Sequence, residues 1–173
     1  MVNFRLAEIY DIDKIMTVIN DAKIYLKKQG SLQWNLDDGY PNKSDLITDI
    51  NNKECYVCLI DNEIIGVMTI IVKPDENYDE IDGCWLNDYN YASIHRIAVK
   101  LNYHHKKIGI KMLKAAEEII KNKGVYSIKI DTHKINIPMI KTLESLDYSY
   151  CGIIKLKRSN EDNLRNAYQK MIK

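Results

Sequence analysis

The chain has 173 residues, of which 46% are apolar and 28% charged, and its net charge is +1. This length and composition are typical of a globular protein whose hydrophobic core is stable without disulfides or metal ions, so we predict a single domain over residues 1–173. The balanced charge argues against a general nucleic-acid-binding protein, and no apolar run approaches the ~20 residues of a membrane span. We therefore expect a cytoplasmic protein with neither nucleic acid nor membrane as a partner.

Cysteine usage indicates no metal centre. Two cysteines, Cys55 and Cys58, have C-x-x-C spacing in a strand-like run, where residues three apart point to opposite faces. No second pair completes a zinc site, and the adjacent His104 and His105 do not easily share one ion. We expect no metal, and reduced, buried thiols at all four cysteines: Cys55, Cys58, Cys84 and Cys151.

Hydrophobic periodicity predicts the elements in chain order. The first half gives a strand at 2–6, a helix capped by Asp11 that ends before Gly30, a short helix at 44–51, and strands at 54–60 and 63–73. After an irregular segment, 74–90, the second half gives a strand at 91–99, a helix at 106–123, a strand at 125–131, a helix capped by Asn136, and strands at 148–156 and 168–172. This order implies an α/β (α+β) fold, a mixed central sheet of six to seven strands flanked by about four helices.

The most informative segment, residues 93–110, is a strand that runs through a short basic loop directly into a helix. The first N–H groups of a helix have no partner within it and carry partial positive charge, so they favour an anion. Basic side chains surround this position: Lys100, His104, Lys106, Lys107 and Lys111. The segment is typical of a pyrophosphate site, and the alternative is a strand–helix turn with a solvated basic rim.

This segment resembles the signature of the GNAT superfamily of N-acetyltransferases. There, a strand ends in an apolar-Ala-Val-like triplet, here Ile97-Ala98-Val99, and a loop of the form Arg/Gln-x-x-Gly-x-Gly/Ala follows, here residues 104–109. Gly109 keeps the last glycine, whereas His104 replaces Arg or Gln and Lys107 replaces the first glycine. The replacements keep the backbone N–H groups, because any residue other than proline supplies one.

The resemblance implies the GNAT-like acyl-CoA N-acyltransferase fold and acetyl-CoA as the co-substrate, bound where the fourth and fifth strands of that fold separate. Backbone groups of Ile97, Ala98 and Val99 would bond the pantetheine arm. The pyrophosphate would lie on the N–H groups of the loop and first helical turn: His104, His105, Lys106, Lys107, Ile108, Gly109 and Ile110. Three residues of the next helix would line the far side of the pantetheine: Asn136, Met139 and Leu143.

Acetyl transfer requires that the amine lose a proton and that the leaving thiolate be stabilised or protonated. His95 is the candidate base, because histidine titrates near neutral pH and arylalkylamine N-acetyltransferases of the superfamily carry a histidine at the aligned position. A half-buried strand histidine with a structural hydrogen bond is the alternative.

The tyrosine that many family members use as a general acid aligns with Leu143. Tyr150 is the nearest substitute by sequence, with a core or surface tyrosine as the alternative.

The acceptor is expected to be a primary amine of a small molecule or a peptide. Loops on a rigid scaffold often carry binding groups, so aromatic residues of segments 31–43 and 74–90 are candidates to bind it. The candidate acceptor-binding residues are Trp34, Tyr40, Trp85, Tyr91 and His133, and loop-pinning aromatic packing is the alternative. Other functions that the sequence leaves open are a non-catalytic acyl-CoA-binding sensor on this fold and a nucleic-acid-binding module that uses the lysine-rich loop. The superfamily often dimerises, so a homodimer is also open.

Overall fold

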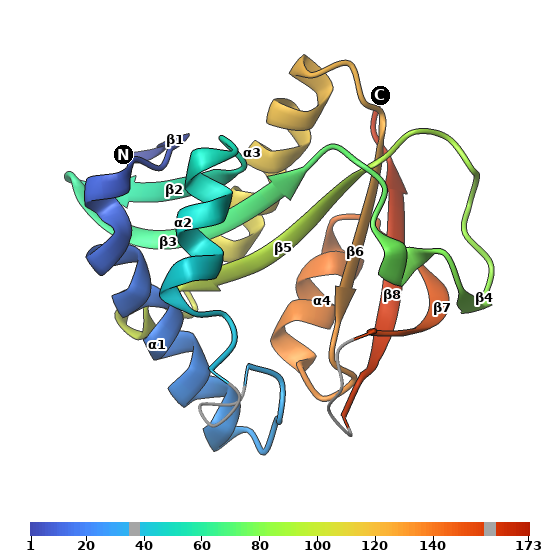
Figure 1. The fold of residues 1–173 in the computed structure, drawn as a ribbon, viewed down its shortest axis with the longest axis horizontal. Coiled ribbons are helices and arrows are strands. Elements are labelled where there is room, and N and C mark those ends of the chain that lie inside the picture. The colour runs from blue at the N-terminus through green and yellow to red at the C-terminus, as the bar shows by residue number, and fades with distance from the viewer. Residues whose placement is uncertain (35–38, 158–161) are drawn as a thin grey trace. The chain divides into compact units, whose positions relative to one another are not determined.

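The structure is a computed structural model that describes residues 1–34, 39–157 and 162–173 (Figure 1). Part of the predicted acceptor-binding segment 31–43, residues 35–38, lies outside the described residues. The chain forms two compact units that interleave along the sequence. Unit 1 comprises Met1–Ile70 and His95–Ala115, and unit 2 comprises Ile71–Ile94 and Ala116–Lys173.

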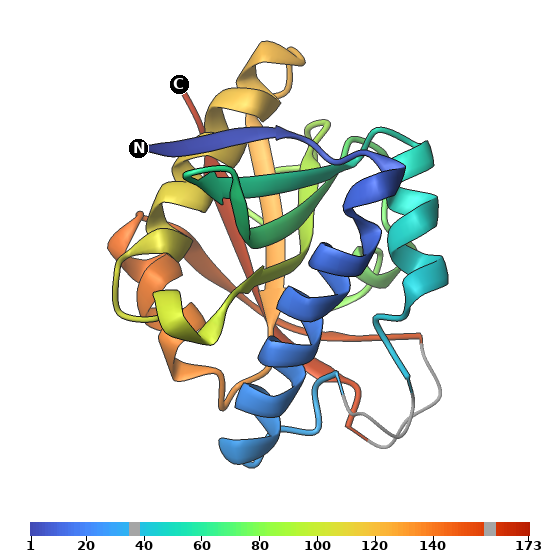
Figure 2. The same ribbon diagram turned by 90° about the vertical axis from the view of Figure 1, so that its left-hand side faces the viewer.

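Unit 1 is a layer of strands between helices. Its strands follow the order β1-β2-β3-β5, with antiparallel pairing of β1 to β2 and of β2 to β3. Helices α1 and α2 cover one face of these strands and α3 covers the other (Figures 1 and 2). The bounds are β1 Val2–Leu6, α1 Ile12–Lys28, α2 Lys43–Asn51, β2 Cys55–Ile60, β3 Glu63–Ile71, β5 Ala92–Val99 and α3 Ile108–Asn122.

Cys55 and Cys58, the C-x-x-C pair, lie on opposite faces of the strands of unit 1. Cys55 lies in the core cluster that α1 and α2 cover. Cys58 lies on the α3 side, where Gly66 brings the backbone so close that an added methyl would lie 2.8 Å from Met112 Sδ and 3.2 Å from Cys58 Cβ. Burial raises the pKa of Cys55 to about 12 and that of Cys58 to about 11, so both thiols are protonated and unreactive at neutral pH.

The start of α1 differs from the prediction in its cap. The helix begins after Asp11, but the Asp11 side chain makes no capping hydrogen bond to it. Instead its carboxylate accepts from Arg5 Nη1 at 2.6 Å and Nη2 at 3.0 Å, and from the Glu8 N–H at 2.9 Å. The Arg5 guanidinium lowers the pKa of Asp11, so this acid joins β1 to the turn that precedes α1.

Unit 2 contains the start of β5, up to Ile94, and four further strands in the order β5-β6-β8-β7-β4. The β5–β6 pair is parallel, with Ala92 opposite Ile128 and Ser93 opposite Lys129, whereas the pairs β6–β8, β7–β8 and β4–β7 are antiparallel. The bounds are β4 Ile81–Gly83, β6 Ser127–Thr132, α4 Ile137–Ser145, β7 Ser149–Lys155 and β8 Leu164–Met171.

The mixed sheet and the four α-helices confirm the predicted fold class, but the sheet has eight strands rather than six to seven. The additional strand is β4, three residues inside the irregular segment 74–90. It has no alternating pattern and is defined by its pairing with β7. Cys84 follows this edge strand and is exposed, so the predicted buried thiol is wrong at this position. Within the described ranges, no helix is long and apolar enough to cross a membrane.

Candidate functional site

The part of the predicted strand–loop–helix from His95 to Ala115 lies in unit 1. Strand β5 leads through a 3-10 turn, Leu101–Tyr103, to α3, which starts at Ile108, two residues later than predicted. The Lys111 N–H donates to the Lys107 carbonyl at 3.2 Å. The N–H groups of the three residues between them therefore precede the hydrogen-bond ladder of the helix and are available to an anion.

Lys107, at the position of the first glycine in the family pattern, has a backbone conformation that favours glycine. Its φ is +56°, and His105 has φ +64°, both in the left-handed region that favours glycine. The lysine therefore keeps the shape of the loop at a cost in conformational energy. The replacement of glycine by lysine therefore changes the side chain at this position but not the path of the backbone.

Two of the loop cations are already engaged. Lys100 Nζ lies 2.7 Å from a Glu63 carboxylate oxygen, and the Lys106 ammonium lies 4.6 Å from the centre of the Tyr103 ring. Among the residues that the structure describes, Lys107 and Lys111 have neither an acid nor an aromatic partner. The free positive charge at the start of α3 therefore comes from these two side chains.

His104, which replaces the Arg or Gln of the family pattern, braces the loop. Its Nε2 lies 3.0 Å from the Val99 carbonyl oxygen, and its ring packs edge-on against Tyr25 with the centroids 4.7 Å apart. A carbonyl oxygen has two lone pairs, so Val99 keeps one for a ligand. The imidazole thus holds the loop against the end of β5.

A buried charged cluster that the sequence did not predict lies beside His95 in unit 1. His95 is half-buried, with its Nε2 shielded from solvent. The next residue, Arg96, has φ +50°, and its Nη1 lies 3.4 Å from Asp49 Oδ2. Thr69 Oγ1 donates to the same carboxylate at 2.8 Å. Burial raises the pKa of Asp49, and this effect exceeds the opposing effects of Arg96 and Thr69.

One signal in the sequence could have indicated Asp49. It lies three residues after Leu46 and one before Ile50, on the apolar face of α2, and all three are buried. A carboxylate on an apolar helix face requires a partner in the interior. Arg96 carries no comparable signal, because its left-handed φ is a property of the folded strand.

The acceptor-binding candidates of unit 1 pack against protein groups. Trp34 is partly buried against the core cluster of this unit. Tyr40 lies over the Arg96 guanidinium, with the ring centre 5.5 Å from the guanidinium carbon. This distance is within the range of a cation–π contact, so Tyr40 belongs to the cluster beside His95.

The candidates Trp85 and Tyr91 meet in unit 2, where they enclose a lysine of the same chain. The Lys129 ammonium lies 4.1 Å from the centre of each ring, and burial lowers the pKa of Lys129. Tyr78, whose ring is tilted against both of these rings, donates a hydrogen bond from its hydroxyl to Asp131 at 2.7 Å. This aromatic cage holds an internal cation.

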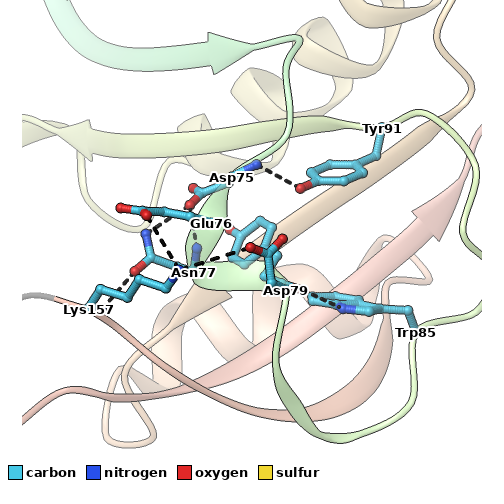
Figure 3. A network of polar contacts seen from close by, with 8 residues as sticks. Asp75, Glu76, Asn77, Asp79, Trp85, Tyr91 and Lys157 are labelled. Carbon is cyan, nitrogen blue, oxygen red and sulfur yellow. Dashed lines mark hydrogen bonds and ion pairs between the residues drawn. The ribbon is translucent and has the colours of Figure 1, made fainter.

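Polar contacts pin segment 74–90 around this cage (Figure 3). The Asp75 N–H donates to the Tyr91 hydroxyl at 2.9 Å, and Trp85 Nε1 donates to the Tyr78 carbonyl at 3.1 Å. At the surface, Lys157 Nζ lies 3.4 Å from Glu76 Oε2. In the structure, Trp85 and Tyr91 therefore pack against groups of the same chain.

The remaining predicted residues also lie in unit 2. His133 Nε2 lies 2.9 Å from Asp162 Oδ1, while its Nδ1 accepts from the Ile135 N–H at 3.3 Å. Tyr150 is 56% exposed and packs edge-on against Tyr168. The contacts of His133 and Tyr150 described here are all with groups of the same chain.

Helix α4 carries the three predicted pantetheine residues. The Asn136 side chain accepts from the Met139 N–H at 3.4 Å, which confirms the predicted cap. Met139 is partly buried, whereas Leu143 is 0% exposed.

In the part of the chain that the structure describes, no three His, Cys, Asp or Glu side chains lie close enough together to hold a metal ion. The mixed sheet and the strand–loop–helix that leads into α3 define the class of the protein, an α/β fold in which a helix begins shortly after a strand of the sheet.

Comparison with known proteins gives the family. The sequence profile of the Acetyltransferase (GNAT) family matches residues 22–148, and the chain belongs to this family. Comparison with curated protein sequences gives no match.

Solved structures agree. A GNAT-family acetyltransferase from Streptococcus agalactiae is 34% identical, with a TM-score of 0.90 over 99% of this chain and 96% of that one. A GNAT-family acetyltransferase from Listeria monocytogenes is 20% identical, with a TM-score of 0.74 over 99% and 95%. The PaiA N-acetyltransferase from Thermoplasma acidophilum, solved in complex with coenzyme A, is 19% identical, with a TM-score of 0.70 over 99% of each chain. The last two likenesses show the fold alone.

Proposed function

We propose that the protein is an N-acetyltransferase that transfers the acetyl group of acetyl-CoA directly to a primary amine of a small molecule or a peptide. The start of α3 carries this proposal. There, three N–H groups precede the helical ladder beside Lys107 and Lys111, two cations that have no acidic or aromatic partner among residues 1–34, 39–157 and 162–173. This donor set suits a pyrophosphate, because backbone N–H groups and ammonium groups both favour its negative charge. A structural relative with coenzyme A bound is consistent with such a donor.

The other donor contacts follow from the family pattern. Backbone groups of Ile97, Ala98 and Val99 would bond the pantetheine arm, with Val99 using the lone pair that His104 leaves free. The donor supplies an activated thioester carbonyl, and the protein supplies orientation and a place for the proton.

In the reaction, the amine nitrogen attacks the carbonyl carbon, the C–N bond forms, the C–S bond breaks and the thiolate leaves. The nitrogen must lose a proton, and His95 is the candidate base that would accept it. Tyr150, which is exposed on β7, is the candidate that would protonate the thiolate.

The first prediction concerns His95. The wild-type protein is incubated with acetyl-CoA and a panel of amines and peptides, and release of free thiol is followed. His95→Ala should lower kcat by roughly 10²–10⁴, the range for loss of a general base. His95→Gln, which keeps the size and a hydrogen-bonding group, should lower it similarly, with the melting temperature unchanged in both.

The activities of the wild type and the variants distinguish an enzyme from a non-catalytic sensor, and a catalytic His95 from a structural one. An unchanged kcat in both variants would make His95 a structural residue. Binding of acetyl-CoA without turnover across the whole panel would favour the non-catalytic sensor and contradict the proposed enzyme. A Tyr150→Phe variant with wild-type kcat would remove Tyr150 from the chemistry.

A further inference from the structure

Strand β5 contains a kink at Arg96. In the strand, Ile94 and Ala98 are buried, and the three residues between them are half-buried in succession, so the usual alternation of faces is interrupted. The cause is the φ of +50° at Arg96. A long side chain is disfavoured in this conformation, which persists only where the surrounding structure fixes it.

Three segments of unit 1 hold the Arg96 side chain in place. The Asp49 carboxylate of α2 lies 3.4 Å from Nη1, and the ring of Tyr40 covers the guanidinium. Thr69 of β3 fixes Asp49 in turn through its 2.8 Å hydrogen bond. The side chains of Arg96 and Asp49 are only 15% and 6% exposed, so the pair is shielded from water.

The geometry of the Asp49–Arg96 ion pair is poorly suited to stabilising the fold. Its 3.4 Å separation is long for a charge-assisted hydrogen bond, and Arg96 Nε is buried with no hydrogen-bond partner among the described residues. Buried ion pairs with incomplete hydrogen bonding often contribute less to stability than apolar side chains of the same size. A role in fixing one backbone conformation accounts for the pair better than stability does.

We propose that Asp49 and Arg96 form a clamp that fixes the kink of β5 and so positions His95, which precedes the kink, and the backbone of Ile97, which follows it. Arg96 is then a positioning residue that does not contact the acceptor. This inference rests on the proposed function, since it acts through His95.

The test uses Arg96→Gly, Asp49→Asn and the double variant in the full-length protein. Glycine adopts a left-handed φ easily, so Arg96→Gly removes the clamp without straining the backbone. Lys53→Gly is the matched control, because Lys53 has φ +57° at the exposed end of α2. Each protein is assayed for kcat, for KM of the amine and of acetyl-CoA, and for melting temperature.

Loss of the clamp should lower kcat about 10–100-fold in Arg96→Gly and in Asp49→Asn, because small displacements of a reacting group have effects of this size. KM for the amine should stay within about threefold, which is the result expected when only transition-state geometry is lost. The double variant should be no slower than the worse single variant, as two members of one unit are not additive. Lys53→Gly should behave as wild type.

Other results would overturn the clamp. An unchanged kcat in Asp49→Asn would do so even if Arg96→Gly failed to fold. A rise in KM for the amine at constant kcat would show that Arg96 binds the acceptor. Restoration of kcat in Arg96→Gly by added guanidinium ions would show that Arg96 acts as a charge, because a free ion cannot hold the backbone. Absence of turnover in the wild-type protein would instead reject the proposed function, and the inference with it.

Discussion

Lys107 holds a strained conformation at the position where the family pattern has a glycine. A left-handed φ costs a lysine about 1–2 kcal/mol, whereas glycine loses about 0.5–1 kcal/mol of chain entropy instead. Lys107→Gly should therefore stabilise the protein by up to about 1 kcal/mol, measured by urea unfolding. Lys111→Gly, which removes the same charge from a regular helical position, should destabilise it by about 1 kcal/mol. Equal effects of the two variants would show that the φ of Lys107 carries no strain.

Asp49 makes the stability of the protein depend on pH. Burial raises its pKa above the ordinary value of 3.8, so the folded protein binds this proton more tightly than the unfolded chain. The stability that the protonated form contributes is complete below pH 3.8 and is lost as pH rises through the folded pKa. The unfolding free energy of wild type minus that of Asp49→Asn, which cannot titrate, should fall as pH rises above 3.8. A difference that grows with pH would mean that Arg96 outweighs burial.

At the scale of elements, Gly66 of β3 sets how closely α3 approaches the strands of unit 1. A methyl group there would lie 2.8 Å from Met112 Sδ, 3.2 Å from the Ala98 carbonyl and 3.2 Å from Cys58 Cβ. The methionine can move, but the backbone carbonyl cannot move without disturbing β5. Gly66→Ala should destabilise the protein by about 1–3 kcal/mol, the usual cost of overpacking, as measured by urea unfolding.

Gly109→Ala is the control for this prediction, since Gly109 lies in α3 with nothing within 4 Å of an added methyl. It should stabilise the protein by about 0.5–1 kcal/mol through helix propensity. A Gly66→Ala variant as stable as wild type would show that α3 can shift away from the strands without cost.

The elements that could be predicted are those with a local cause. Helix α3 and its loop follow from an apolar stripe and a basic turn, and the α4 cap follows from one asparagine. Strand β4 could not be predicted, because three residues become a strand only by pairing with β7. The cage around Lys129 and the Asp49–Arg96 pair could not be predicted either, because they join residues that are far apart in the sequence. No sequence pattern specifies which buried charge meets which aromatic or acidic partner.

At the scale of the whole molecule, the net charge of +1 conceals a local excess of positive charge at the start of α3. If acetyl-CoA binds there with a Kd of roughly 1–10 µM, 1 mM ligand should stabilise the protein by about 2.7–4.1 kcal/mol. For a protein of this size, the melting temperature should rise by roughly 5–15 °C, measured by a thermal shift assay. The rise should shrink as salt is added, because Lys107 and Lys111 are exposed and salt screens them.

Charge variants locate this effect within the molecule. The double variant Lys107→Gln with Lys111→Gln should lose a large part of the thermal shift, whereas Lys114→Gln removes a charge from an exposed position further along α3 and should retain it. A full shift in the double variant would mean that backbone N–H groups hold the donor without help from these cations. No shift in the wild-type protein at 1 mM acetyl-CoA would contradict donor binding itself, because even a Kd of about 100 µM predicts a stabilisation of about 1.4 kcal/mol under these conditions.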